Sequence, residues 1–421
     1  MSARRVCLAF AAAIAVASMP FASRAADPQE IVIGSILPLT GPSAQTGAGL
    51  RTAQTLAADL VNGHVSYPLP MVGKSGLPHL GHARIKLVFA DSQGKPDQAR
   101  AAAEQLITQE HAVALIGTYA SSTTATASQV AERYGIPFLN PDSSAPSLTA
   151  RGLKWFFRTT PNDATFAENF YQFFADLNRT KKIAVKKVAV VGEDGLFGTG
   201  AGDAEEEIGK RRGFTIVTRV AYPATTTEVN AEVQKVKAAA PDVVMMASYA
   251  PDALLFMRGF KDQGILLQGI LAQDAGFIDP GFVKTEGKDA EGVFTREVFS
   301  LDIKHRNKAV PLIDQLFRLR FGDKPLDGNT ARDIMGVLVL ADAIDRAGST
   351  KPDAIRTALQ NTNIPGILTL MPWKQIKFDA QGQNVGGVGI IEQIQDGKYE
   401  TVWPFDVAVK APIWPMPAWK R

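Results

Sequence analysis

The chain has 421 residues, of which 46% are hydrophobic and 21% are charged. This balance is ordinary for a folded protein and excludes wholesale disorder and fibrous repeats. The length allows about two to three domains, each large enough to bury its own core.

The first part of the chain, residues 1–25, predicts a secretory signal peptide. Two arginines at 4–5 form a basic start, residues 6–16 form an apolar run, and residues 23–25 place small side chains at a cleavage position. The alternatives are a membrane anchor and a buried first helix. The apolar run is too short to span a bilayer, and a core helix would not need the basic start. We therefore expect an exported chain that begins at Ala26.

Removal of this leader changes the charge balance. The whole chain has 45 Lys and Arg against 42 Asp and Glu, and the leader holds three of the basic residues and no acidic one. The remainder is therefore close to neutral, which makes it a poor candidate for nucleic-acid binding. The single cysteine, Cys7, leaves with the leader, so we expect no disulfide, no thiol nucleophile and no cysteine-ligated metal.

After the leader, strands and helices alternate. The hydrophobic pattern predicts three helices: one at 48–61, one that begins at Pro96, and one that ends at Tyr134. They are interleaved with strands at 31–37, 84–90, 113–117 and 136–139. Glycine and proline punctuate residues 65–81, which we expect to form an irregular surface insertion.

The alternation restarts near residue 161. The pattern predicts helices at 162–178, 202–212, 229–239 and 252–262, and strands at 187–191, 214–220, 243–247 and 270–272. Three helices follow, at 310–321, 331–347 and 352–360, and the dipeptide Asp396-Gly397 predicts a hairpin between strands 389–394 and 399–403. Alternating strands and helices indicate parallel sheets covered on both faces, and the restart indicates two such α/β domains.

Motifs for catalysis or cofactor binding are incomplete. The glycine-rich run 198–202 follows a strand, as a dinucleotide-binding fingerprint does, but Asp203 stands where the third small residue belongs, so a glycine-rich turn is favoured. Residues 73–75 lack the upstream glycine of a phosphate loop. The five histidines are expected to be solvated or isolated, and no serine-hydrolase elbow or metalloprotease motif occurs. We expect no enzyme, no cofactor and no metal.

Polar side chains gather where two successive strands end. The strand at 113–117 leads into a helix that opens with four hydroxyl residues at 121–124, more than a helix cap needs. The next strand ends just before 140–146. Helix starts at the carboxyl ends of parallel strands attract anions, so these segments predict an anion-binding crevice suited to a carboxylate. The candidate residues are Ser121, Ser122, Asp142, Ser143 and Ser144.

Four segments, in order, resemble the branched-chain amino-acid binding proteins of ABC transporters, which are type I periplasmic binding proteins. They are 31–42 (IVIGSILPLTGP), 117–124 (GTYASSTT), 136–144 (IPFLNPDSS) and 157–161 (FRTTP). The resemblance implies an α/β fold of two Rossmann-like lobes, a Venus flytrap joined by three crossover strands. Lobe one would comprise 27–158 plus 296–370, and lobe two 160–294 plus 373–421.

The resemblance also implies roles for individual residues. Ser121 matches the serine that grips the ligand carboxylate, and Ser144 matches a hydroxyl residue that shares this work. Asp274 falls where the family has an acidic partner for the ligand ammonium. Aromatic or pocket-lining positions of the family fall on Phe197, Tyr249 and Thr46.

Several departures from the family pattern leave the ligand open. Asp142 replaces a small residue, Thr46 replaces a bulky aromatic, and the family disulfide of lobe one is absent. Asp142 has the alternative role of binding turn N–H groups, and Asp274 has the alternative of pairing with a base from lobe two.

The resemblance therefore implies a periplasmic solute-binding protein that is a monomer. It would close its lobes on a small carboxylate, most simply an amino acid, and deliver it to the membrane permease and ATPase subunits of an ABC importer. Closure excludes water and strengthens the few polar contacts that hold a charged group. The alternatives are a binding protein for aromatic or other hydrophobic carboxylates, or a sensor partner of the same fold.

Overall fold

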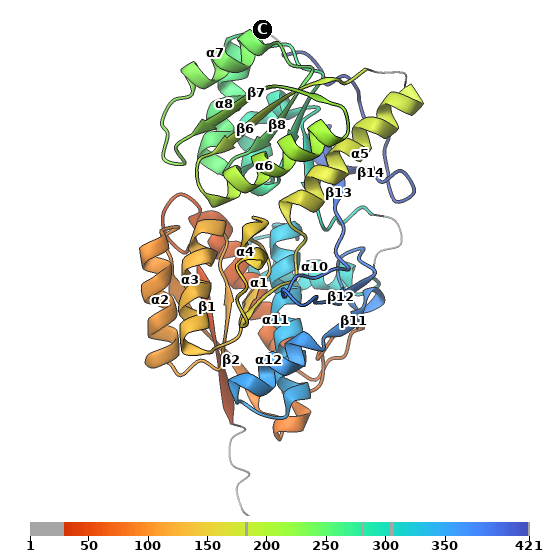
Figure 1. Cartoon of the computed structure of the whole chain (residues 1–421). Helices are drawn as coiled ribbons and strands as arrows, with labels where there is room; N and C mark the ends of the chain where they lie inside the picture. The colour runs from red at the N-terminus through yellow and green to blue at the C-terminus, as the bar shows by residue number, and fades with distance from the viewer. Residues whose placement is uncertain (1–28, 182–183, 280, 304–306, 420–421) are drawn as a thin grey trace, which may run out of the picture.

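The computed structural model describes residues 29–181, 184–279, 281–303 and 307–419. These residues form two α/β units stacked end to end, each built on its own sheet (Figure 1). The expected signal peptide lies outside the described residues. Within the described ranges, no helix combines the length and the apolar character that a membrane crossing needs.

The first unit, at the bottom of Figure 1, contains a parallel sheet in the order β2-β1-β3-β4-β5. Helices α2 and α3 share a core with one face of this sheet, and α1 packs on the other. The elements are β1 (Glu30–Leu37), α1 (Ala44–Asn62), β2 (Arg84–Asp91), α2 (Pro96–Thr108), β3 (Ala114–Gly117), α3 (Ser121–Tyr134), β4 (Phe138–Asn140), α4 (Ser147–Ala150) and β5 (Phe156–Arg158).

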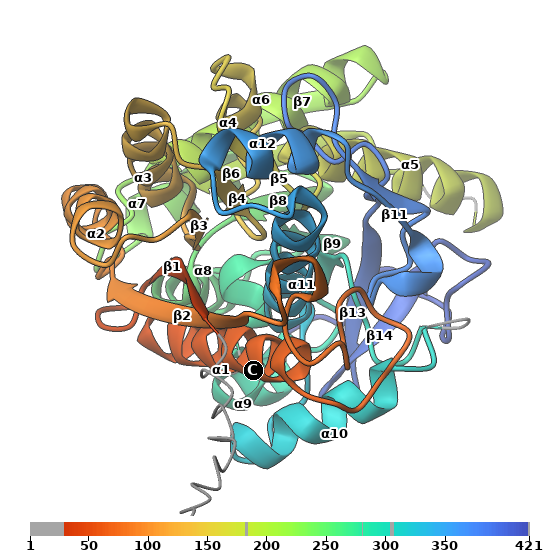
Figure 2. The same ribbon diagram turned by 90° about the horizontal axis from the view of Figure 1, so that it is seen from below.

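A later segment of the chain completes the first unit. Its helix α11 is buried along almost its whole length, lies beside α1 and sits near the middle of the molecule when seen from below (Figure 2). Apolar residues on several sides of a helix are typical of a helix enclosed by other elements. The elements of this segment are α10 (Val310–Arg320), α11 (Gly328–Ala347), α12 (Pro352–Gln360), β11 (Asn363–Pro365) and β12 (Gln375–Lys377).

The second unit contains a mixed sheet in the order β14-β13-β10-β9-β8-β6-β7, with β13 antiparallel to both of its neighbours. Two cores cover its two faces. The elements are α5 (Asp163–Lys181), β6 (Lys187–Glu193), α6 (Leu196–Arg211), β7 (Thr215–Tyr222), α7 (Asn230–Ala239), β8 (Val243–Ala247), α8 (Ala250–Asp262), β9 (Gly269–Ala272), α9 (Phe282–Glu286), β10 (Phe294–Glu297), β13 (Ile390–Gln395) and β14 (Lys398–Trp403). Short 3-10 turns are η1 (Pro78–Leu80), η2 (Ala275–Ile278), η3 (Gly287–Ala290) and η4 (Gly366–Leu368).

The chain passes between the two units three times. It leaves the first sheet after β5, returns after β10, and enters the second sheet again at β13. The expected two-lobed α/β fold with parallel sheets is therefore confirmed. The residue at which each lobe begins stays a prediction, and β10 runs through one of the expected boundaries as part of the second sheet.

Two expectations about loops are wrong. The segment 65–81 is not only a surface insertion, because Leu69, Val72 and Leu77 are buried in the first core. The run 198–202 is not a turn, because α6 begins at Leu196 and includes these glycines. A Cβ on Gly198 would lie 2.1 Å from the backbone oxygen of Glu193, so a glycine allows the helix to start this close to the strand.

Candidate functional site

The start of α3 lies at the carboxyl end of β3, in the gap between the two units. The residue before it, Ala120, has no side chain that could cap the helix. Ser121 is buried and lines a cavity in the gap, and its hydroxyl accepts a hydrogen bond from Ala145 N at 3.3 Å. The uncapped N–H groups of this first turn therefore face the cavity together with one hydroxyl, an arrangement that suits an anion.

The other hydroxyls of this segment mainly bind one another. Thr118 Oγ1 lies 2.6 Å from the hydroxyl of Thr123 and 2.8 Å from that of Thr124. Thr124 Oγ1 in turn lies 2.7 Å from Ser143 Oγ. Ser122 does not line the cavity. The surplus of hydroxyls over capping needs is thus explained largely by a network that joins the ends of β3 and β4.

The segment after β4 brings three of the predicted residues to the same cavity. Asp142, Ser143 and Ser144 are buried and line it. Ser143 Oγ donates to the backbone oxygen of Tyr119 at 2.9 Å, and Ser144 Oγ accepts from Arg296 at 3.2 Å. We name this cavity the polar cleft. Its lining residues are Tyr119, Ser121, Asp142, Ser143, Ser144, Phe197, Tyr249, Asp274, Ala275, Asn329 and Arg332.

The second unit supplies an aromatic wall to the polar cleft. The ring of Tyr249, at the start of α8, lies 5.5 Å from that of Phe197 and 6.0 Å from that of Tyr119, measured between centroids. Thr46 does not line the polar cleft. Its hydroxyl donates to Asp279 Oδ2 at 2.9 Å and so links α1 of the first unit to the second unit.

Two buried arginines that the sequence did not nominate hold the acidic residues of the polar cleft. Arg332, from α11, places Nε 2.9 Å from Asp142 Oδ1 and a terminal nitrogen 3.0 Å from Asp274 Oδ2. Arg296, from β10, donates to the same oxygen of Asp274. Asp274 therefore pairs with bases, as its alternative role proposed, but both arginines fall within the range 296–370 that was expected to form lobe one, and Arg296 belongs to the second sheet.

Both arginines are anchored by further groups. Arg332 also donates to the side-chain oxygen of Asn329, one turn earlier on α11. The guanidinium carbon of Arg296 lies 3.7 Å from the ring centroid of Phe166, and one of its nitrogens lies 3.6 Å from Asp163. The sequence alone does not separate Arg332 from other charged residues of the same helix, such as Asp333 and Arg346, because only packing shows that it is buried.

Burial raises the pKa of three carboxyl groups in or near the polar cleft. Burial raises the pKa of Asp142, although its hydrogen bond with Asp333 and the nearby Arg332 oppose this change. Burial and the adjacent Asp142 carboxylate raise the pKa of Asp333 well above its ordinary value, which favours a proton shared between the two groups. Burial raises the pKa of Asp163 to about 6, against the effect of Arg296.

The two arginines respond differently to this environment, and burial lowers the pKa of Arg296 although Asp274 and Asp163 oppose the change. Burial opposes the charged form of Arg332, but the Asp274 and Asp142 carboxylates outweigh it and raise the pKa of this guanidinium. The acidic residues Asp142 and Asp274 are consequently compensated within the protein. Asn329 is different, because its side-chain nitrogen is buried, faces the polar cleft and has no hydrogen-bond partner among the described residues.

The polar cleft encloses only about 20 Å³, little more than a water molecule needs. A larger ligand therefore requires the two units to separate or the lining side chains to move. Among the described residues, no group of three or more His, Cys, Asp or Glu side chains is arranged to hold a metal ion. The expectation of no resident metal concerns the whole chain and stays a prediction.

The glycine-rich start of α6 offers no room for a nucleotide phosphate. The Glu193 carboxylate accepts hydrogen bonds from the backbone N–H groups of Gly195 and, at 2.7 Å, Gly198. An acidic side chain of the protein thus occupies the place where a dinucleotide-binding fold holds its pyrophosphate.

Comparisons with known proteins agree with this geometry. Residues 30–398 match the family described as periplasmic binding protein. Leu/Ile/Val-binding protein homolog 8 of Brucella suis biovar 1 (strain 1330) is 27% identical over 421 residues, which cover 97% of this chain and 98% of that protein.

Solved structures show the same fold. The leucine-binding protein LivK of Thermotoga maritima MSB8 superimposes with a TM-score of 0.73 at 21% identity and covers 88% of this chain and 97% of its own. The branched-chain amino acid transporter substrate-binding protein LivJ of Streptococcus pneumoniae, in complex with isoleucine, gives 0.73 at 21% identity and covers 88% and 98%.

Proposed function

The chain belongs to the periplasmic binding protein family, whose members bind solutes and are not enzymes, and on this premise we propose that it is the substrate-binding component of an ABC importer. It takes a small carboxylate-bearing solute into the polar cleft and closes its two lobes on it. We further propose that it acts as a monomer in the periplasm, after cleavage of its leader, and delivers the solute to membrane permease and ATPase subunits.

The observation that carries this proposal is the uncapped start of α3 in the polar cleft. Its free N–H groups and the Ser121 hydroxyl favour an anion, and the partial positive charge of a helix start adds to this preference. The side-chain nitrogen of Asn329, on α11, has no hydrogen-bond partner among the described residues and offers a further donor. A carboxylate accepts several such hydrogen bonds at once.

The positive charges of Arg296 and Arg332 help to decide whether the bound carboxylate also carries an amine. The resemblance assigned Asp274 to a ligand ammonium, but two guanidinium groups already contact this carboxylate. An α-amino acid must displace Arg332 before its ammonium can reach Asp274, whereas a carboxylate without an adjacent amine need not. The geometry therefore favours hydrophobic carboxylates, and the names of the relatives favour an amino acid as the second candidate.

A matched pair of ligands separates these two classes. We expect 4-methylpentanoate, which is leucine without its amine, to bind at least as tightly as leucine in isothermal titration calorimetry. A preference of 100-fold or more for leucine would show that Arg332 yields to the ammonium and would restore the amino acid as the ligand class. Solution scattering on the same samples should show a smaller radius of gyration with bound ligand.

Variants of two adjacent serines test the anion site itself. Ser121→Ala should weaken carboxylate binding by about 1–2 kcal/mol, or about 5- to 30-fold, because the backbone N–H groups remain. Ser122→Ala is the matched control, since this hydroxyl does not line the polar cleft, and should change affinity less than about twofold. Equal effects of the two variants would contradict the proposed site.

A further inference from the structure

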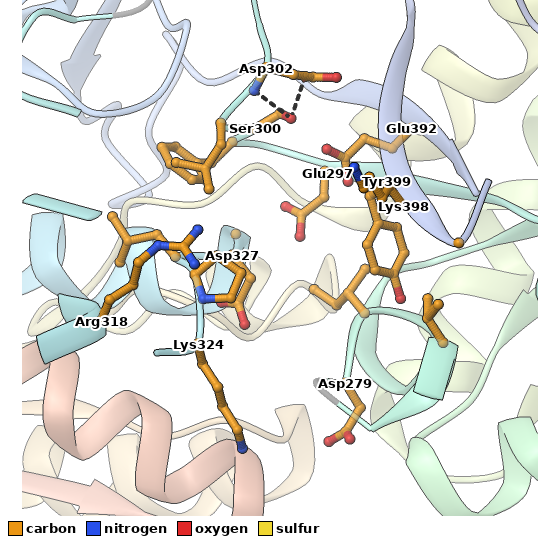
Figure 3. Close-up of a pocket in the computed structure, with 18 of the residues that line it drawn as sticks. Asp279, Glu297, Ser300, Asp302, Arg318, Lys324, Asp327, Glu392, Lys398 and Tyr399 are labelled. Atoms are coloured by element: carbon orange, nitrogen blue, oxygen red, sulfur yellow. Dashed lines mark hydrogen bonds between the residues drawn. The ribbon is translucent and has the colours of Figure 1, made fainter. Parts of the chain in front are cut away.

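A second cavity lies beside the polar cleft and is much larger, at about 500 Å³ (Figure 3). Cavities of roughly 300–1,000 Å³ are typical of small-molecule sites. The first unit contributes Arg318, Phe321 and the connection 324–328, and the second contributes Ile278 and Tyr399 among others. A molecule bound here would therefore contact both lobes. The α11 start borders both cavities, with Gly328 in this one and Asn329 in the polar cleft.

The pairing of β10 with β13 places two glutamates in this cavity. Thr295 lies opposite Glu392 in the antiparallel register, so Glu297, two residues further along β10, projects from the same face as Glu392. Both side chains are buried and line the cavity, and Glu297 points into its open space (Figure 3). Two like charges at neighbouring positions of one sheet face repel each other, and the repulsion is relieved by a bound proton or by a cation that lies between them. We name this space the acidic cavity.

Among the described residues, neither of these two glutamates forms an ion pair, although the charge of Arg332 acts on Glu297 and opposes the rise of its pKa. The Glu297 carboxylate accepts a hydrogen bond from the adjacent backbone N–H of Val298 at 2.8 Å. The Glu392 carboxylate, with only 5% of the residue exposed, lies near the Ser300 hydroxyl, which opposes the rise of its pKa. This hydroxyl has a single hydrogen and donates it to Asp302 at 2.6 Å, so it leaves Glu392 without a hydrogen bond from the described residues. No ion pair within the described ranges includes either glutamate.

The other acidic residues of the cavity have structural roles. Asp302 accepts hydrogen bonds from the backbone and hydroxyl of Thr401, at 2.9 and 2.6 Å. Asp327 caps α11 through the backbone N–H of Thr330 at 2.8 Å. Asp279 accepts hydrogen bonds from the Thr46 hydroxyl and the Gly281 backbone N–H, so Glu297 and Glu392 are the acidic residues of the wall with the fewest hydrogen bonds from described residues.

Three basic residues, Arg318, Lys324 and Lys398, line the cavity wall, and among the described residues none of them forms an ion pair with Glu297 or Glu392. Arg318 pairs with Asp314 at 2.8 Å, and the Lys324 ammonium lies 4.7 Å from the ring centroid of Phe321. Figure 3 shows both across the open space from Glu392. Neither compensates the two glutamates.

The remaining wall is apolar and aromatic, with Phe299, Phe321, Leu326 and Tyr399 among its residues. A hard metal ion would need more converging oxygen ligands, whereas an ammonium group on a carbon skeleton matches carboxylates beside aromatic rings. We propose that the acidic cavity binds an organic ammonium group between Glu297 and Glu392. The ammonium belongs either to a separate amine or to the far end of a ligand whose carboxylate lies in the polar cleft. The inference does not depend on the carboxylate site.

Hexylammonium is the probe for this site, and uncharged hexan-1-ol is its control. Calorimetry on the full chain should show binding of hexylammonium and none of the alcohol at the same concentration. Glu392→Gln and Glu297→Gln should each weaken hexylammonium binding by about 10- to 100-fold, because each removes one charge-assisted contact. Glu400→Gln is the matched control, since Glu400 lies on the same hairpin but pairs with Lys410 at 3.0 Å outside the cavity, and it should retain wild-type affinity.

Two further ligands distinguish the sources of the ammonium. If one ligand spans both cavities, 6-aminohexanoate should bind more tightly than hexanoate and lose affinity in both Ser121→Ala and Glu392→Gln. If a separate amine binds, hexylammonium and hexanoate should bind together, and only hexanoate should respond to Ser121→Ala. Either result supports the acidic cavity as an ammonium site.

Equal binding of hexylammonium and hexan-1-ol, or an affinity unchanged in both glutamate variants, would overturn the proposal. If a variant fails to fold, the melting temperature of the wild-type chain tests the proposal instead. It should rise with hexylammonium and stay unchanged with hexan-1-ol. A carboxylate site that fails while hexylammonium binding persists would count against the proposed function alone.

Discussion

The polar cleft and the acidic cavity lie side by side, yet they treat buried carboxylates in opposite ways. In the polar cleft, Asp142 and Asp274 both contact Arg332. The cleft that they help to line has a volume of only about 20 Å³. In the acidic cavity, Glu297 and Glu392 form no ion pair with any residue that the structure describes, and they face a space of about 500 Å³. A single strand serves both regions, because alternation along β10 directs Arg296 to the polar cleft and Glu297 to the opposite face.

This difference shows that a buried acid does not by itself identify a ligand position. Where a guanidinium already contacts the carboxylate, the acid mainly holds the arginine in place. Where room is available and no cation is present, the bound molecule must supply the positive charge. Stability measurements on variants can test this division, since breaking a buried pair costs free energy and removing an unpaired charge does not.

Arg332 should give the largest effect. Arg332→Met leaves Asp142 and Asp274 without their shared partner in a buried site, which should lower the free energy of unfolding by about 3–5 kcal/mol. Urea denaturation followed by circular dichroism measures this change. Arg320→Met is the control, because Arg320 pairs with Asp59 on the surface, and such pairs contribute about 0–1 kcal/mol. Similar losses in the two variants would show that Arg332 is not a buried partner.

Asp274→Asn should give the second-largest loss of stability. The family resemblance alone would predict that Asp274→Asn alters ligand binding and leaves stability untouched. The structure predicts a loss of about 2–4 kcal/mol without any ligand, because Arg296 and Arg332 lose part of their compensation. Thermal or urea unfolding of the ligand-free chain decides between the two. A melting temperature equal to that of the wild type would return Asp274 to a purely ligand-binding role.

The sequence predicted the α/β alternation well where strands are short, fully buried apolar runs. The predicted strand at 243–247 and helix at 352–360 match the structure residue for residue, and the Asp396-Gly397 hairpin is present. Such elements are determined by local patterns, which one sequence contains in full.

The polar cleft was predicted only in part, because its composition depends on tertiary contacts. Ser121 and Asp142 lie where the crevice argument placed them. Arg296 and Arg332 were missed because a lone arginine in a strand or helix is indistinguishable from a solvated one until packing buries it. Thr46 was placed by resemblance, but the geometry of α1 directs it to Asp279 instead.

Glu297, in the acidic cavity, should make the free energy of unfolding of the protein depend on pH. Burial is the main cause that raises its pKa to about 8, and Arg332 opposes this change. A carboxyl whose pKa is raised on folding stabilises the protein below its unfolded pKa of about 4.3, and this stability is lost as the pH rises toward 8.

Glu297→Gln should therefore flatten the decline of unfolding free energy between about pH 5 and pH 8. The expected change in slope is up to about 1.4 kcal/mol per pH unit, the value for one proton. Urea titrations at several pH values measure it. Burial also raises the pKa of Glu205 to about 8, so the decline of unfolding free energy in the wild type does not by itself identify Glu297 as its cause. Glu205→Gln is therefore the matched comparison. An identical slope in Glu297→Gln and wild type would contradict the assignment.

Glu392→Gln should have the smallest effect on the free energy of unfolding, and it contrasts most directly with Asp274→Asn. Glu392 accepts no hydrogen bond from a described residue, and burial raises its pKa well above the ordinary value, with the nearby Glu297 as a further cause. A glutamine of the same shape removes the repulsion between the two acids and breaks no ion pair. Glu392→Gln should therefore leave the free energy of unfolding unchanged or raise it by up to about 1 kcal/mol at neutral pH. The same urea experiment that detects the loss in Asp274→Asn measures this value. A loss of about 2 kcal/mol or more would mean that Glu392 has a structural partner within the protein, and the acidic cavity would then resemble the polar cleft rather than oppose it.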